Sequence, residues 1–130
     1  METKLSIDDL YTDSGSFDEQ RILKILQGKI VFTKENEIIF VTDPNKLKAG
    51  GSILLYALAK KILALHKKID SEIITSAEVA SKTKIRPNTI DVSIMRLKDK
   101  KTLLPAGNGY QIPVFKIEEI VSLLTKNKQK

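Results

Sequence analysis

The sequence predicts an α+β fold, and three observations carry this prediction. Apolar residues recur at helical spacing in several segments, most clearly over residues 52–65. Two pairs of β-prone runs are each separated by a few turn-forming residues, which is typical of β-hairpins. The chain has 130 residues, 42% of them hydrophobic and 29% charged, and this length and composition suit one globular core with short attachments.

The first fifty residues are expected to form a tail, a helix and a hairpin. Residues 1–16 are acidic and rich in turn formers, so we expect a flexible tail there. Ser16 followed by Glu19 has the spacing of a capping box, which predicts a helix that ends at Gly28. Two β-prone runs then flank a short polar loop and predict a hairpin. Residues 17–50 therefore form an extension of helix plus β-hairpin, with strands at 29–33 and 38–42.

The next segment is expected to hold three helices. The first helix starts near Ser52, after Gly50-Gly51, and ends near residues 67–68. A short apolar piece at residues 73–74 has the character of one strand. Thr75 and Glu78 repeat the capping-box spacing, which predicts a short helix over residues 76–82. A proline suits the first turn of a helix because it has no amide hydrogen, so Pro87 predicts a third helix over residues 87–100.

The third helix has two distinct faces at 100° per residue. One face clusters apolar and small residues, namely Ile90, Ser93, Ile94 and Leu97, and is expected to pack inward. The opposite face is expected to stay exposed and carries Asn88, Val92, Met95, Arg96 and Asp99.

A second hairpin and a last helix complete the chain. The residues Ala106-Gly107-Asn108-Gly109 have the pattern of a tight turn between two short strands. A final helix follows, with an apolar stripe of Ile117, Ile120, Val121 and Leu124, and residues 126–130 are expected to form a frayed basic tail.

Composition excludes several classes of protein. No run approaches the roughly 20 apolar residues of a membrane-spanning helix, and the first residues lack the pattern of a secretory signal. The chain has no cysteine, hence no disulfide and no thiolate metal site. We therefore expect a cytoplasmic protein without membrane contact.

Charge is distributed unevenly along the chain. Residues 1–50 hold seven basic and nine acidic side chains, a net charge of −2, whereas residues 51–130 hold fifteen and seven, a net charge of +8. A basic module favours an anionic partner such as nucleic acid, through release of counterions from phosphates. The alternative is a lysine-rich surface produced by heat adaptation or codon bias, because lysine supplies 19 of the 22 cations.

The order of elements over residues 52–113 resembles the winged helix-turn-helix DNA-binding superfamily. Residues 75–80 and 85–90 resemble the two helix starts of that family, residues 94–97 the end of its recognition helix, and residues 109–112 its returning wing strand. The resemblance covers roughly half the chain, at the level of the fold. It implies a winged helix-turn-helix domain over residues 51–125. The chain departs from the family pattern at Lys84, where glycine is common, and at a wing tip that carries Asn108 but no arginine or lysine.

The resemblance implies binding of double-stranded DNA, with the third helix in the major groove. Base contacts would come from the exposed N-terminal half and outer face of that helix, where asparagine suits adenine, arginine suits guanine and a methyl group suits the thymine methyl. The candidates are Arg86, Asn88, Thr89, Val92 and Arg96, with Asn108 at the wing. Contacts to phosphates, which position the protein without specifying sequence, would come from Lys82, Lys84, Lys98, Lys100 and Lys101.

Other interpretations of these residues stay open. The lysines at 98–101 suit a solvated helix end equally well. Val92 and Met95 suit contacts with the wing or with another protein. Gly50-Gly51-Ser52 is either a phosphate site at a helix N-terminus or a flexible connection with an N-cap.

The sequence gives little support for a catalytic site. His66 is the sole histidine and lies among lysines near a helix end, where solvent exposure is expected. The adjacent pairs Asp8-Asp9 and Glu118-Glu119 diverge, so neither supplies the opposed carboxylates of acid–base catalysis. We expect no enzyme, no cofactor and no metal site.

The sequence also suggests a two-fold dimer, since each domain of this kind covers one half-site. The interface would be either the stripe of Ile117, Ile120, Val121 and Leu124, or the N-terminal helix and hairpin with Ile30, Phe32, Ile39 and Val41. The alternative is that both segments complete a single core. The function expected is sequence-specific or semi-specific duplex binding by a transcriptional regulator. The alternative is a winged-helix protein-interaction module within a transcription or replication assembly, and a nucleic-acid-modifying enzyme ranks third.

Overall fold

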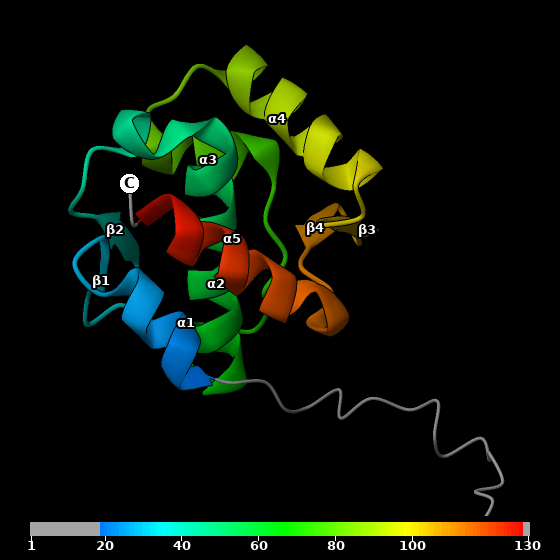
Figure 1. The fold of residues 1–130 in the computed structure, drawn as a ribbon. Helices are drawn as coiled ribbons and strands as arrows, with labels where there is room; N and C mark the ends of the chain where they lie inside the picture. The colour runs from blue at the N-terminus through cyan, green and yellow to red at the C-terminus, as the bar shows by residue number, and fades with distance from the viewer. Residues whose placement is uncertain (1–18, 129–130) are drawn as a thin grey trace, which may run out of the picture.

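The structure, a computed structural model, describes residues 19–128. This part of the chain is a mixed α and β fold, as predicted, with five α-helices and two small antiparallel hairpins (Figure 1). The elements in order are α1 (Glu19–Leu26), β1 (Ile30–Phe32), β2 (Ile38–Phe40), α2 (Lys48–Leu65), α3 (Ser76–Thr83), α4 (Pro87–Asp99), β3 (Leu104–Ala106), β4 (Gly109–Gln111) and α5 (Ile117–Lys128). The expected acidic tail, the Ser16 cap and residues 129–130 lie outside the described residues.

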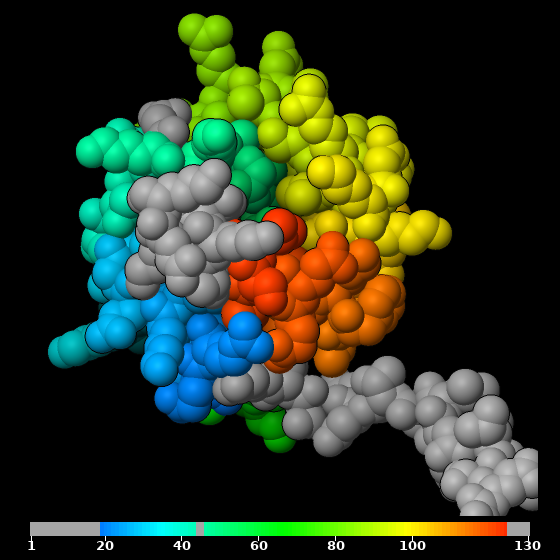
Figure 2. Space-filling view, in the orientation of Figure 1, coloured from blue at the N-terminus to red at the C-terminus, as the bar shows by residue number. Residues whose placement is uncertain are grey.

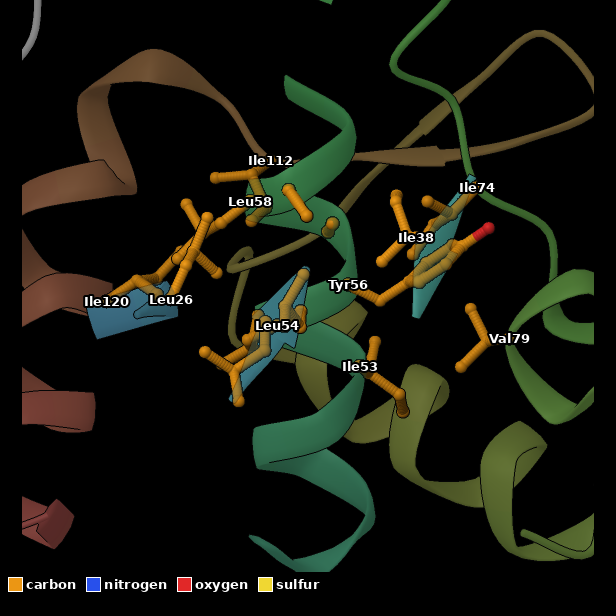
Figure 3. Packing of buried hydrophobic residues seen from close by; sticks show 14 of the residues in the cluster. Leu26, Ile38, Ile53, Leu54, Tyr56, Leu58, Ile74, Val79, Ile112 and Ile120 are labelled. Carbon is orange, nitrogen blue, oxygen red and sulfur yellow. The ribbon is translucent and has the colours of Figure 1, made fainter. Parts of the chain in front are cut away.

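Helix α2 forms the centre of the molecule. Its residues 52–59 and 61–63 are all buried, so the helix is enclosed on every side rather than along the single face that its spacing predicted (Figure 3). A helix that is apolar all round suits such a position. One continuous core joins α2 to the N-terminal hairpin, to α3 and α4, and to α5.

The start of α2 corrects the expectation for Gly50-Gly51-Ser52. The helix begins at Lys48 and is preceded by a 3-10 turn, Pro44–Leu47, so both glycines lie inside it and Ser52 is fully buried. These residues belong to the helix, with Gly50 and Gly51 in its first turn, so they are not a flexible connection. The boundary expected between residues 50 and 51 also falls within this helix.

The N-terminal helix and hairpin pack against α2 much as predicted. Gly28 ends α1 with a φ of +81°, a left-handed conformation that glycine adopts without strain. Strands β1 and β2 pair antiparallel, with Val31 opposite Ile39. Ile30 and Ile38 face the core, whereas Val31, Phe32, Ile39 and Val41 are exposed. Ile30 is therefore not available for a dimer contact, which corrects one of the residues proposed for that surface.

Helices α3 and α4 start where their local signals predicted, and their ends differ from the prediction by one residue each. Thr75 caps α3: its hydroxyl accepts from the Glu78 amide at 3.1 Å, and its own amide donates to the Glu78 carboxylate at 3.4 Å. Pro87 occupies the first turn of α4. The buried hydroxyl of Thr83, the last residue of α3, donates to the Val79 carbonyl at 2.8 Å and accepts from the Ile85 amide in the turn at 3.2 Å.

The second hairpin is joined to the segment before α3. Strands β3 and β4 pair antiparallel around the turn Gly107-Asn108. The hairpin is as predicted, but Ala106 and Gly109, expected in the turn, belong to the strands. The strand expected at residues 73–74 is a single bridge, in which Ile74 exchanges hydrogen bonds of 2.9 and 2.8 Å with Tyr110. This bridge ties the hairpin to the segment that leads into α3.

Helix α5 lies beside α1 and closes the core (Figure 1). Ile117, Ile120 and Val121 are buried there and Leu124 is half-buried. Ile117, Ile120 and Val121 are therefore part of the core of this chain. The prediction that they form a dimer interface is wrong for these three residues. The helix continues through Lys128.

Within residues 19–128, none of the helices combines the length and the apolar character that crossing a membrane requires.

Candidate nucleic-acid interface

Helix α4 is anchored by one face and open on the other. Its inner face buries Ile90 and Ile94, at 0% and 2% exposure, against α2 and α3. On its outer face Val92 and Met95 are 52% and 47% exposed, and Asn88, Thr89 and Arg96 are exposed as well. Helix α4 forms one margin of the molecule, with its side chains projecting outward (Figure 2). The helical periodicity therefore predicted both faces of α4 correctly.

The charges around α4 gather at its two ends. Before the helix lie three cations, of which Lys84 and Arg86 are exposed and Lys82 is half-buried. At its far end Lys100 and Lys101 are exposed and Lys98 is half-buried, beside the exposed carboxylate of Asp99. The 13 residues of the helix separate these clusters by about 20 Å. The sequence between them, residues 87–97, holds one acidic and one basic side chain and is neutral overall.

The second hairpin lies near the C-terminal end of α4 (Figure 1). Asn108 at its tip is exposed, as expected for a residue that meets a ligand. The preceding Gly107 has a φ of +53°, the conformation that a tight turn of this kind requires.

A shallow groove of about 480 Å³ lies between α3 and α4. It brings the predicted Lys84 and Arg86 together with Ser76, Ser81 and Asp91. Ser76, Ser81 and Asp91 were not predicted from the sequence as residues of a site. The capping box was a usable signal for Ser76, because it places that residue in the first turn of α3. Asp91 lies on the flank of α4 and sets a negative charge beside the two cations.

Lys84 adopts a left-handed conformation, with φ 61° and ψ 22°. Its amide donates to the Ala80 carbonyl at 2.8 Å and so closes α3. A side chain in this region carries a steric cost of about 1 kcal/mol. Lys84→Gly is therefore expected to leave the fold intact and to raise the free energy of unfolding by up to about 1 kcal/mol, measured by urea denaturation. A loss of stability would show that the lysine side chain contributes contacts that outweigh this strain.

A buried polar cluster links α2 to α3. The Tyr56 hydroxyl donates to the Glu78 carboxylate, and the Lys60 ammonium donates to the same carboxylate oxygen at 2.9 Å and to the Ile73 carbonyl at 2.7 Å. Glu78 also completes the cap of α3, so a single carboxylate fixes the start of α3 to the central helix. Burial, then the hydrogen bond and the charge of Glu78, raise the pKa of Tyr56 above its ordinary value. The contacts of Tyr56 and Lys60 with Glu78 were not predicted from the sequence.

The raised pKa of Tyr56 predicts a loss of stability in alkali. The unfolded chain ionises this phenol near pH 10 while the folded chain keeps it neutral, so the stabilisation is complete below pH 10 and declines above it. The slope from this one group is about 1.4 kcal/mol per pH unit. Tyr56→Phe is expected to cost about 1 kcal/mol at pH 8 and to remove this component of the slope. Urea denaturation of both proteins from pH 8 to 11 tests it, and parallel profiles would contradict it.

His66 is exposed as expected, but it has a partner that the sequence did not reveal. Its Nε2 lies 2.7 Å from a carboxylate oxygen of Glu19, which joins the end of α2 to the start of α1. Among residues 19–128 no three histidine or acidic side chains gather as a metal site would require.

No family model matches the chain, and comparisons with curated proteins and with solved structures found no match.

Proposed function

We propose that this protein is a winged helix-turn-helix protein that binds double-stranded DNA through α4 and acts as a transcriptional regulator. The observation that carries the proposal is the anchored helix with an open outer face, neutral in the middle and cationic at both ends. A helix of this diameter enters the major groove, which is about 12 Å wide. The side chains of its outer face then meet base edges, while cations at its ends meet the phosphates that border the groove.

The order of elements supports the same fold. Helix α2, the bridge at Ile74, helices α3 and α4 and the second hairpin follow one another as in a winged helix-turn-helix domain. The left-handed residue between α3 and α4 lies where that family often has glycine. In this proposal the β3–β4 hairpin is the wing, and Asn108 at its tip contacts the minor groove or the backbone.

A protein-interaction module is the second candidate, and the exposed Val92 and Met95 favour it. Apolar side chains on an open helix face suit a groove or helix of another protein as well as a duplex. The net charge of +8 over residues 51–130 favours the polyanion.

The test is duplex binding at several salt concentrations. If about five phosphates are neutralised, log affinity falls with a slope of about −4 to −5 against log salt. Lys100→Ala is expected to reduce the steepness by about one. Lys34→Ala serves as the charge-matched control, because it removes an exposed cation in the loop of the N-terminal hairpin and should leave the slope unchanged. Absence of binding at low salt would favour the protein-interaction module.

A further inference from the structure

Two large apolar side chains occupy the middle of the outer face of α4. Val92 and Met95 are about half exposed, although the core beneath them is filled by Ile90 and Ile94. They lie three residues apart on one helix and therefore side by side. On a face that meets only phosphates and polar base edges, these side chains would displace water from polar groups of the DNA without offering them hydrogen bonds in return.

Duplex DNA displays one apolar group in its major groove, the 5-methyl group of thymine. Guanine, cytosine and adenine present hydrogen-bonding groups there but no methyl group. If α4 lies in that groove, Val92 and Met95 find an apolar partner only at thymine. The chemistry of the exposed pair therefore selects the base.

A polar neighbour strengthens this choice. Asn88 precedes Val92 by four residues on the same exposed face, which places their Cβ atoms about 5–6 Å apart. This distance spans one to two base-pair steps of about 3.4 Å. An asparagine amide pairs with both major-groove groups of adenine, so adenine and thymine methyl contacts fit on neighbouring base pairs.

We propose that α4 recognises A·T-rich duplex DNA through the thymine methyl groups, with Val92 and Met95 as the methyl-contacting residues and Asn88 as the adenine-contacting residue. This inference rests on the proposed function, since it specifies the ligand of the same helix face. Under this proposal the sequence preference of the protein depends on the thymine methyl group, which can be removed from DNA without changing base pairing.

The experiment compares alternating A·T duplexes that contain either deoxythymidine or deoxyuridine, which lacks only the methyl group. The wild-type protein is expected to bind the thymidine duplex about fourfold more tightly for each methyl group contacted, the equivalent of burying one methyl. A second pair of duplexes, alternating G·C with cytosine or 5-methylcytosine, places a methyl in the same groove without A·T shape. Methylation of that pair is expected to raise the affinity in the same direction.

Variants assign the effect to the two residues. Val92→Ala and Met95→Ala are expected to shrink the thymidine preference, and the double variant to abolish it. Because both side chains are exposed, these variants are expected to keep the fold. An unchanged melting temperature of each variant checks this. Leu123→Ala, which truncates a side chain of similar exposure on α5, is the matched control and should keep the full preference.

The outcomes separate this inference from the proposed function. Binding of both A·T duplexes with equal affinity would overturn the methyl recognition alone and leave the exposed pair as a surface for a protein. Absence of duplex binding at low salt would overturn the proposed function and the inference together.

Discussion

Replacing Gly109 with alanine is expected to lower the free energy of unfolding by about 3 kcal/mol. A Cβ at this position would lie 2.1 Å from the Ile74 carbonyl oxygen and 2.9 Å from the Ile74 carbonyl carbon. Both are backbone atoms, so no side chain can rotate away to relieve the clash. The bridge between Ile74 and Tyr110 must open, which detaches the second hairpin from the segment that precedes α3.

Gly50→Ala is the matched control. Gly50 lies inside α2, and nothing comes within 4 Å of a Cβ built there. Alanine favours a helix over glycine, so this variant is expected to raise stability by about 0.5 kcal/mol. Urea denaturation is expected to show a lower free energy of unfolding for Gly109→Ala and a higher one for Gly50→Ala. A Gly109→Ala protein as stable as the wild type would contradict the packing of the hairpin on Ile74.

The elements that local chemistry fixes were predictable from the sequence. The capping box of Thr75 and Glu78, Pro87 at the first turn and the Gly107-Asn108 turn each act within a few residues. Their effects do not depend on the rest of the chain, and the starts of α3 and α4 and the place of the second hairpin followed from them.

The start of α2 was not predictable in this way. A pair of glycines inside a helix costs roughly 1 kcal/mol per residue in local propensity, so the segment at residues 50–51 indicated a break. Burial of the apolar run that follows, residues 53–59, compensates for this cost and extends the helix back to Lys48. The start of α2 at Lys48 is thus determined by tertiary packing, which the local sequence does not indicate.

The candidate site was likewise predictable only where the information lies within one element. Periodicity alone placed Asn88, Val92 and Arg96 on the open face of α4, because one helix determines which residues share a face. The groove beside Asp91 and the contact of Tyr56 and Lys60 with Glu78 require two helices to meet. Contacts of this kind depend on how far apart elements pack, which the spacing of residues in one chain does not specify.

Arg96→Ala is expected to weaken binding to the preferred duplex by about 10- to 100-fold and binding to random duplexes by much less. Arg96 is exposed on α4, and an arginine guanidinium that pairs with guanine through two hydrogen bonds contributes about 1–3 kcal/mol of discrimination. The preferred duplex is obtained by selection from a random pool. Lys100→Ala should instead weaken both kinds of duplex alike, because a phosphate contact carries no sequence information.

A third variant, Arg96→Lys, separates the charge of Arg96 from its geometry. Lysine keeps the positive charge but lacks the planar fork that donates two hydrogen bonds to one base. Its affinity for random duplexes is expected to match that of the wild type, while the loss on the preferred duplex remains. Full recovery on both duplexes would assign Arg96 to the phosphates, and base recognition by α4 would then rest on its asparagine and its two exposed apolar side chains.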